Sequence, residues 1–478
     1  MIVLLKTIQV IAALTLLVLV HELGHFAFAK MFHTRVDKFY LFFNPKFSIV
    51  KCKKVGGRLR FKFFAANEDD YDPEGNPLDP ESLGIDDWRR YPENTEYGIG
   101  WVPLGGYCKI AGMIDESMDK KAMALPPKPW EFRTKPAWQR FLIMFGGVLN
   151  NFILAIVLYS VILGHWGEEY LKTEDAVYGI ATNDLSYEIG FRDGDRILSL
   201  DGEPVENFSM IQANLVRSKA TEALVLRDGD TVSIRIDPVY IPAMLNTPGM
   251  FGLAFPFVIG EVPEESINVD SDIQAGDEMV AINGKEMFLV NVIQKELLNY
   301  KDSIITASLK RDGEMLESRL AVDTAGHIGV MLDTDFTKFF TVTTNKYGFP
   351  EAVPAGAAKA WQTIRSYVQE LGLIFSPKTE AYKSVGSFIA IGRIFPDTWD
   401  WYRFWSLCAM LSIMLGVLNL VPIPGLDGGH ILFLIVEMVT GRKPGDKFLE
   451  VAEMIGLILI CALMVLAFGN DIKSLFIH

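Results

Sequence analysis

The sequence predicts a polytopic α-helical membrane protein with four transmembrane helices, a cytoplasmic membrane-associated β region and two extracytoplasmic β-rich domains. Two observations predict this fold class: four long apolar stretches, and a β-rich pattern of about 80 residues that occurs twice between the second and third stretches. Of the 478 residues, 50% are hydrophobic and only 22% are charged, which excludes intrinsic disorder and argues against an ordinary soluble enzyme. The net charge of −14 lacks the basic excess that duplex nucleic acid requires, so no nucleic acid is expected as a partner.

The first apolar stretch covers residues 2–20 and, with the residues that follow it, is long enough to cross a bilayer core of about 30 Å. A cleaved signal peptide is the alternative, since Ala27-Phe28-Ala29 resembles a cleavage site. The apolar run is too long for that role, and its start carries only Lys6. We therefore expect residues 1–32 to form a retained transmembrane helix.

Three further stretches are expected in the membrane: residues 138–164, residues 402–430, which hold the third helix and the ligand loop after it, and residues 446–470. The segment 35–62 has nine Lys and Arg against one acidic residue, and further basic residues lie between the third and fourth stretches. By the positive-inside rule, both of these connections are cytoplasmic. Both termini and the region between residues 165 and 400 are then extracytoplasmic.

The first connection, residues 33–137, is expected to be a cytoplasmic β region with an acidic insertion. Residues 35–64 alternate in character and contain a Gly56-Gly57 turn, which indicates a basic hairpin. Residues 67–96 carry eleven acidic residues and four prolines, which indicates a surface loop. Residues 97–112 are again strand-like and are punctuated by glycine.

The outer region contains an internal repeat. Residues 190–202 (GFRDGDRILSLDG) match residues 272–284 (DIQAGDEMVAING) at an offset of 82 residues, and an Asp-Gly hairpin follows each copy. Two domains are therefore expected, at residues 176–240 and 250–333. Each resembles the PDZ module in its circularly permuted form, which binds extended peptide at a sheet edge. The alternative is that both are spacers or steric plugs without a peptide ligand.

Residues 350–400 should contain an extracytoplasmic amphipathic helix and a connector. Trp361, Ile364, Val368 and Leu371 recur at helical spacing. Such a helix would lie on the outer membrane surface or on the two β-rich domains.

The residues with metal chemistry are in HELGH, residues 21–25, at the cytoplasmic end of the first span. On a helix, His21 and His25 share one face with Cβ atoms roughly 6 Å apart, which suits a shared Zn²⁺, and Glu22 can reach a water there. Ionisable groups at membrane depth are functional by default, although an interfacial cap facing water is the alternative. The chain has four cysteines and no CxxC pair, so a metal must be held by His, Asp or Glu.

A catalytic zinc keeps three protein ligands and one open position. The best candidate for the third ligand is Asp427, in NLVPIPGLDGGH at residues 419–430, where two prolines and three glycines break the third span. Its alternative role is that of a turn aspartate that caps the next helix. Four competing ligands lack this irregular scaffold: His430, Glu437, Glu450 and Glu453.

On these motifs the chain resembles the site-2 protease family of intramembrane zinc metalloproteases, in its bacterial sigma-E protease branch with tandem PDZ modules. The resemblance covers nearly the whole length, through HELGH, PLGGYCKIAG (103–112), FGGVLNNFILA (145–155) and GVLNLVPIPGLDGGH (416–430). It implies that His21, His25 and Asp427 bind zinc, that Glu22 is catalytic and that Asn419 helps to hold the substrate. Two features depart from the family pattern: Gly146-Gly147 stands where Gly-Pro is usual, and residues 67–96 look like an insertion.

The resemblance also implies a mechanism, with Zn²⁺ as the cofactor, although other divalent ions suit the same ligands. The ion polarises the scissile carbonyl and acidifies a water, and Glu22 carries the proton to the leaving amine. A helical substrate must unwind, and a strand edge from residues 97–112 or 35–64 could replace its lost hydrogen bonds. Asn419 could bind the opened backbone or support the oxyanion.

Expected partners follow from the same resemblance. They are the lipid bilayer of a bacterial cytoplasmic membrane and single-span membrane proteins already trimmed by another protease, such as anti-sigma factors or remnant signal peptides. The PDZ-like domains would reject substrates with bulky outer domains, or bind peptide ligands.

Two other functions compete with proteolysis. A catalytically inactive membrane scaffold that presents PDZ modules is disfavoured by the intact HELGH and Asp427. A metal transporter would leave Glu22 without a role and would need several stacked ligand sites, whereas the sequence offers one.

Overall fold

The computed structural model describes residues 2–68, 78–113 and 125–476. Four of the described helices are long and apolar enough to cross a membrane. They are α1 (Ile2–Met31), α3 (Ala137–His165), α10 (Trp401–Leu420) and the part Lys447–Lys473 of α12 (Asp446–Phe476). The four expected spans are therefore confirmed as apolar helices, while the side of the membrane that each end faces stays a prediction.

The chain folds as two compact units. The first unit comprises residues 1–166, 346–368 and 385–478 and contains all four of these helices. The second comprises residues 167–345 and 369–384. The predicted amphipathic helix is present as α8 (Phe349–Ile374), which contributes residues to both units.

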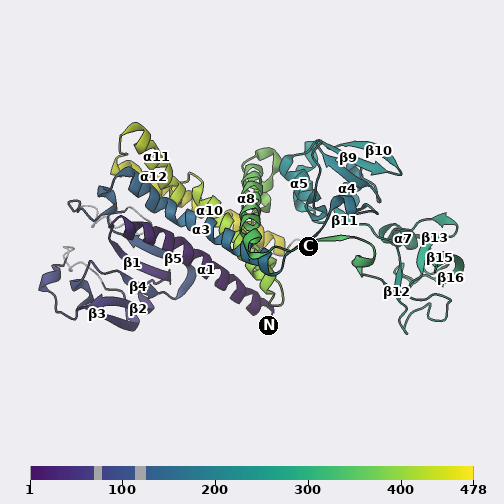
Figure 1. Ribbon diagram of the computed structural model, residues 1–478, viewed down its shortest axis with the longest axis horizontal. Coiled ribbons are helices and arrows are strands. Elements are labelled where there is room, and N and C mark those ends of the chain that lie inside the picture. Colours follow the sequence, from purple (N-terminus) through teal and green to yellow (C-terminus); the bar gives the residue numbers. More distant parts are fainter. Residues whose placement is uncertain (1, 69–77, 114–124, 477–478) are drawn as a thin grey trace. The chain divides into compact units, whose positions relative to one another are not determined.

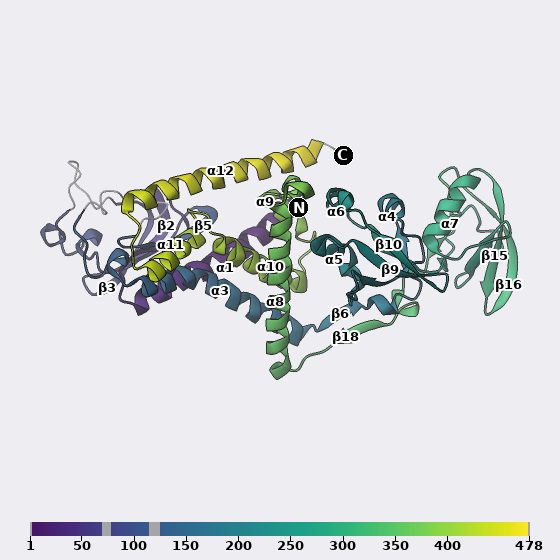
Figure 2. The ribbon, with the colours of Figure 1, turned by 90° about the horizontal axis from the view of Figure 1, so that it is seen from above.

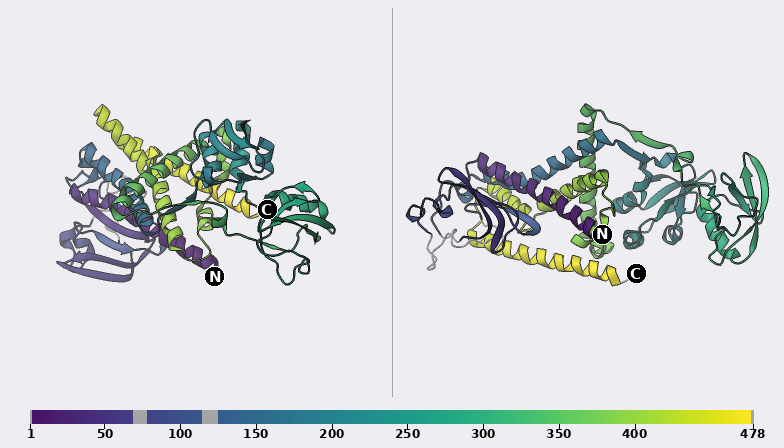
Figure 3. Two further views of the ribbon diagram at one scale, coloured as in Figure 1. Left: turned by 45° about the vertical axis from the view of Figure 1, so that its right-hand side comes forward. Right: turned by 90° about the horizontal axis from the view of Figure 1, so that it is seen from below.

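In the first unit, α3 packs between α1 and α10 (Figure 1). Small residues permit the close approach of the helices, since Gly24 of α1 lies directly against the backbone of Gly146 of α3. Polar side chains add contacts at the same level: Asn150 donates to the carbonyl of Val20 at 3.2 Å. Helix α12 is the outermost span, as Figure 2 and Figure 3 show from opposite sides. Its apolar window is only 6% buried.

A five-stranded sheet lies at the end of α1 that carries the two histidines, with the order β3-β2-β4-β1-β5. The strands are β1 (Val36–Phe43), β2 (Phe47–Val55), β3 (Arg58–Ala66), β4 (Glu96–Ile99) and β5 (Val102–Ile110). The predicted Gly56-Gly57 turn joins β2 to β3. One face of the sheet packs on α1, since Phe39 and Tyr97 contact the ring of Phe26 at centroid distances of 5.3 and 6.0 Å. Strand β5 is the last strand in this order and contacts α1, so it forms an edge of the sheet beside that helix.

The acidic insertion covers part of the other face of this sheet. Of residues 67–96, expected as a surface loop, the stretch 69–77 lies outside the described residues, and the remainder includes two short 3₁₀ turns. Trp88 is only 2% exposed and its ring lies beneath the ammonium groups of Lys51 and Lys62, at 5.2 and 4.7 Å. Cation–π contacts thus hold the insertion on a basic face of the sheet. The acidic composition of the insertion did not indicate this contact.

The second unit contains two modules of related construction. The first has β7 (Ile180–Thr182), α4 (Asp184–Ile189), β8 (Arg196–Leu200), α5 (Ile211–Ser218), β9 (Glu222–Arg227), β10 (Asp230–Arg235), α6 (Ile241–Asn246) and β11 (Phe251–Leu253). The second has β12 (Ile259–Glu261), β13 (Glu278–Ile282), β14 (Lys285–Glu286), α7 (Val290–Leu297), β15 (Ile304–Arg311), β16 (Glu314–Ala321) and β17 (Met331–Leu332). Figure 3 shows α7 beside the sheet of the second module.

The repeat seen in the sequence is reproduced by one buried ion pair in each module. Arg227 forms two hydrogen bonds with Asp195, both at 2.7 Å, and Arg311 forms two with Asp277 at 2.7 and 2.8 Å. Both carboxylates are fully buried. Each ion pair holds the glycine turn of its module against the first strand of the Asp-Gly hairpin.

The first module extends further than the expected boundary at residue 240, because β11 pairs with β7. The chain enters and leaves the modules through β6 (Glu168–Leu171) and β18 (Val342–Asn345), which pair antiparallel. Beyond α8, the chain returns to the first unit through α9 (Phe388–Ile394). The last short helix, α11 (Asp427–Thr440), follows α10 after a six-residue loop.

Candidate active site

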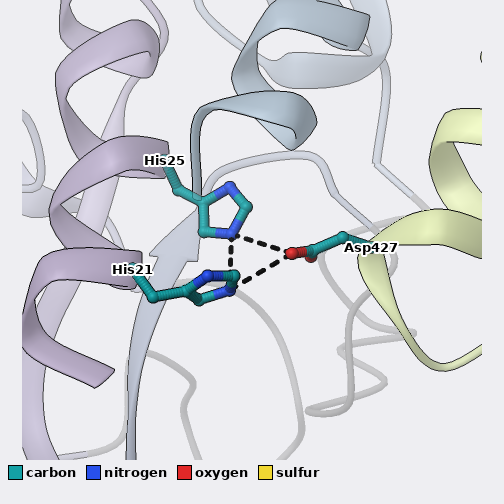
Figure 4. A group of neighbouring side chains, drawn as sticks. All are labelled: His21, His25 and Asp427. Carbon is teal, nitrogen blue, oxygen red and sulfur yellow. Dashed lines mark hydrogen bonds and ion pairs between the residues drawn. The ribbon is translucent and has the colours of Figure 1, made fainter. Parts of the chain in front are cut away.

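Helix α1 presents His21 and His25 side by side from one face, one turn apart, as the HExxH spacing predicts (Figure 4). Both residues are buried, with 8% and 6% of their surface exposed. Their rings are nearly perpendicular, and the two Nε2 atoms lie 3.2 Å apart. Two imidazole nitrogens thus point at one position inside the first unit.

Asp427 reaches the same position from the other side because helix α10 ends at Leu420 and a loop follows it. The loop 421–426 turns through Gly425 at a φ of +91°, and α11 begins at Asp427 itself. A Cβ atom at Gly429 would lie 2.6 Å from the Cα of Pro424, so only glycine lets α11 fold back this closely. The residue at the N-cap is Leu426, with no side-chain capping bond, so Asp427 is not the capping aspartate that was the alternative.

The three side chains fit a tetrahedral divalent ion. Asp427 Oδ2 lies 3.2 Å from His21 Nε2 and 3.4 Å from His25 Nε2 (Figure 4). Ligand atoms of a tetrahedral zinc site, each about 2.0–2.1 Å from the ion, lie about 3.3–3.4 Å from one another. Asp427 Oδ2 is also buried without a hydrogen-bond donor, which is costly unless a cation satisfies it. Among the residues that the structure describes, this is the group suited to hold a metal.

The rings are oriented by α3. His25 Nδ1 lies 2.8 Å from the carbonyl oxygen of Ile143, and a carbonyl can only accept, so Nδ1 carries the proton and the Nε2 lone pair faces the cluster. His21 Nδ1 lies 3.1 Å from the side-chain amide of Asn151. Gly147 leaves room for both rings, because a Cβ atom there would lie 2.7 Å from His21 Cε1 and closer still to His25 Nε2.

A cavity of about 530 Å³ opens beside this cluster, and both Glu22 and Asn419 line it. The Glu22 carboxylate accepts a hydrogen bond from the backbone of Cys108 on β5. The Asn419 side-chain amide lies 3.3 Å from His21 Nε2. All five site residues predicted from the sequence therefore surround one cavity.

The competing ligands have other partners. Glu437 forms an ion pair with Arg140 of α3, and His430 Nε2 lies 3.2 Å from Glu453 Oε1 of α12. Within the described residues, the group suited to a metal includes neither these three side chains nor Glu450.

Sequence reasoning missed the groups that orient the histidines. The carbonyl of Ile143 carries no side-chain signal at all. Gly147 was noticed only as a departure from the family pattern, and its packing role became apparent from the structure. Asn151 could have been found, because adjacent asparagines in an apolar span must each find a polar partner.

Comparison with known proteins identifies relatives over the full chain. The model of peptidase family M50 matches residues 9–66 and 83–463, and the gap between the two ranges falls in the acidic insertion. "Protease RseP" of Yersinia pestis is 26% identical over 497 aligned positions, covering 97% of this chain and 98% of that protein. "Regulator of sigma-E protease RseP" of Salmonella typhimurium is 26% identical over 490 positions, with 97% and 98% covered. "Putative zinc metalloprotease" of Vibrio cholerae is 25% identical over 499 positions, with 98% of each chain covered. The chain therefore belongs to peptidase family M50, the site-2 protease family, and is a metalloprotease.

Proposed function

We propose that the protein is an intramembrane zinc metalloendopeptidase that cleaves the transmembrane segments of single-span membrane proteins already trimmed outside the membrane. The observation that carries the proposal is the convergence of three acceptor atoms, from His21, His25 and Asp427, on one position beside a cavity that Glu22 also lines. Relatives named zinc metalloproteases support zinc as the ion.

The residues of the cavity have distinct roles in this proposal. His21, His25 and Asp427 would hold the zinc ion, which would supply Lewis acidity toward a carbonyl oxygen and a water. Glu22 takes a proton from the attacking water and delivers it to the leaving amine. Asn419 donates its amide N–H to the opened substrate backbone or to the oxygen on which negative charge develops.

Strand β5 supplies the surface on which the substrate unwinds. Residues 105–110 line the cavity, and the hydrogen bond between the backbone of Cys108 and Glu22 directs that peptide group away from β1. Because alternate residues of a strand point their peptide groups the same way, Gly106 also directs its N–H and C=O away from β1. An unwound substrate segment can therefore pair with β5 as an added strand and recover the hydrogen bonds of its helix. The hairpin of β2 and β3 is the other candidate, but its strands lie farther along the sheet.

The two repeated modules, which we propose to be PDZ-like domains, give the enzyme its selectivity. Folded extracytoplasmic modules exclude partners with large outer domains, so cleavage follows an earlier trimming step. The active site then faces the cytoplasmic side of a bacterial inner membrane, in keeping with the basic residues between positions 35 and 62. Relatives named as regulators of sigma-E protease support a place in regulated proteolysis.

The test is cleavage of a pre-trimmed single-span substrate by the Glu22→Gln variant in reconstituted membranes. The variant keeps all three ligands, so it should hold as much zinc as wild type while its turnover falls by about 100-fold or more. Glu450→Gln removes a carboxylate from α12 and is the matched control, which should cleave at the wild-type rate. Cleavage by Glu22→Gln at that rate would exclude the proposed role of Glu22.

The inactive scaffold makes a different prediction. A scaffold that presents PDZ-like domains need not hold metal, so wild-type protein would purify without stoichiometric zinc and would cleave no trimmed substrate. About one zinc ion per chain, lost when Asp427 is replaced, would exclude the scaffold.

A further inference from the structure

Asn151 of α3 lies against the outer nitrogen of one candidate zinc ligand. Its side-chain Nδ2 is 3.1 Å from His21 Nδ1, and the residue is fully buried. Its Oδ1 is also buried, and it has no hydrogen-bond partner. The orientation of this amide therefore has to follow from what each of its two ends does to His21.

The two ends of the Asn151 amide have opposite consequences for His21. If Nδ2 donates to His21 Nδ1, the imidazole proton must sit on Nε2. That proton would then point at His25 Nε2 and Asp427 Oδ2, 3.2 Å away in each case, and no lone pair would be left for a metal. If the amide is turned by 180°, Oδ1 accepts the proton of Nδ1 and the Nε2 lone pair faces the cluster.

We propose that Asn151 is a positioning residue of the metal site, which accepts the Nδ1–H of His21 through Oδ1 and so fixes the metal-binding tautomer. The carbonyl oxygen of Ile143 orients His25 in the same way, since it lies 2.8 Å from His25 Nδ1. Ile143 precedes Asn151 by eight residues on the same face of α3. Metal-binding histidines generally donate their second N–H to such an acceptor. Helix α3 thereby orients both imidazoles, one with a main-chain oxygen and one with a side-chain oxygen.

The position of Asn151 is itself secured. Ser412 of α10 is fully buried and donates its hydroxyl to the carbonyl oxygen of Asn151 at 2.8 Å. The neighbouring Asn150 holds α3 against α1 through the carbonyl of Val20, one residue before His21. Asn150 thus supports helix packing without touching either imidazole ring, which makes it a matched control.

The experiment measures zinc affinity of the full-length protein in detergent by competition with a chelator. Asn151→Leu keeps the approximate volume and removes the acceptor, so its zinc affinity should fall about 10- to 100-fold. Asn151→Asp keeps an acceptor at the same place and should stay within about threefold of wild type, or bind more tightly. Asn150→Leu should also stay close to wild type. Substitution with Co²⁺ gives an absorption spectrum that should change in Asn151→Leu alone.

The inference rests on the proposed zinc site, and the two can fail separately. Wild-type protein without zinc would overturn both. If wild type binds zinc and Asn151→Leu binds it equally well, the inference alone is overturned. It is also overturned if Asn150→Leu loses as much affinity, or if Asn151→Asp loses as much as Asn151→Leu. Should Asn151→Leu fail to fold, a zinc affinity of Asn151→Asp about tenfold below wild type would decide against the proposal.

Discussion

Gly147 of α3 faces the imidazole ring of His25 on α1 with no space between them for a methyl group. A Cβ atom at this position would also lie 2.7 Å from His21 Cε1. Both rings are buried, and neither can move away without leaving its partner on α3. The absence of a side chain at Gly147 is therefore a packing requirement of the candidate metal site.

Gly147→Ala should displace both imidazoles and lower turnover by about 100-fold, since a shift of about 1 Å at a reacting centre has an effect of that size. Zinc content should fall with turnover. Gly469→Ala in α12 is the matched control, because a Cβ atom there meets nothing within 4 Å. If Gly147→Ala keeps the zinc content and turnover of wild type, α3 can shift to accept the methyl group, and the metal site does not require the close packing.

Much of this site could be predicted from the sequence, because its first ligands carry local signals. HELGH places two imidazoles on one helix face by spacing alone, and the two prolines before Asp427 mark a break in an apolar helix. The orientation of the rings could not be predicted, because it depends on a main-chain carbonyl of Ile143 and on which residues of α3 face α1. That register is set by tertiary packing.

The fold divides in the same way. Hairpins with Asp-Gly or Gly-Gly turns were predictable, since turn chemistry is local. The sheet order was not, because the parallel pairing of β1 with β4 joins residues about 60 positions apart around the insertion. The burial of Trp88 was not predictable for a related reason. An acidic, proline-rich stretch is expected to be exposed to solvent unless its lysine partners on the sheet are known.

The third metal ligand can be tested against its competitors. Asp427→Ala should reduce zinc from about one ion per chain to almost none, because two imidazoles alone make a weak and incomplete site. His430→Gln should keep its zinc, since the partner of His430 is Glu453 on α12. Metal analysis of both purified proteins is the measurement. Loss of zinc from His430→Gln together with full zinc in Asp427→Ala would reverse the assignment.

The native thiol of Cys108 provides a direct probe of substrate binding on β5, because this residue lines the cavity and its backbone contacts Glu22. With Glu22→Gln as a trap and the other cysteines replaced, single cysteines placed around the scissile bond of a substrate should form disulfide cross-links to Cys108. A second variant that keeps Cys408 as its single cysteine is the control and should remain unlinked, because Cys408 is fully buried in α10. Absence of any cross-link to Cys108, with binding otherwise intact, would argue against strand addition at β5.

The ion pair of Asp277 and Arg311 should make the second module sensitive to acid. Burial raises the pKa of Asp277, but the Arg311 guanidinium and the backbone N–H of Gln274 outweigh burial and hold the pKa below its ordinary value. The unfolded carboxyl then binds its proton more readily than the folded one. The stabilisation is therefore complete above about pH 5 and is lost as the pH falls below about 4 and through the folded pKa.

Asp277→Asn removes this charge and should destabilise the module by about 2 kcal/mol at neutral pH. Native-state hydrogen exchange in the full-length protein, corrected for intrinsic rates, should show roughly 30-fold faster exchange of the amides of β13 and β15. The difference from wild type should shrink on acidification. Asp270→Asn, at an exposed position, is the control. If Asp277→Asn leaves the acid dependence of this hydrogen exchange unchanged, the ion pair is not its cause.

The gating role of the modules can be tested by excision, because β6 and β18 pair and bring the two ends of the modules together. Deleting residues 176–333 should leave the zinc site intact and allow a substrate with its outer domain to be cleaved at about the rate of the trimmed one.

A smaller deletion is also available, since Asp333 N–H donates to the carbonyl of Val258 at 2.9 Å and so brings the ends of the second module together. If exclusion is steric, removing residues 259–332 alone should relax selectivity only partly, in proportion to the bulk removed. If a bound peptide triggers cleavage instead, the larger deletion should abolish cleavage of both substrates while zinc content stays at one ion per chain, and that outcome would refute the steric account.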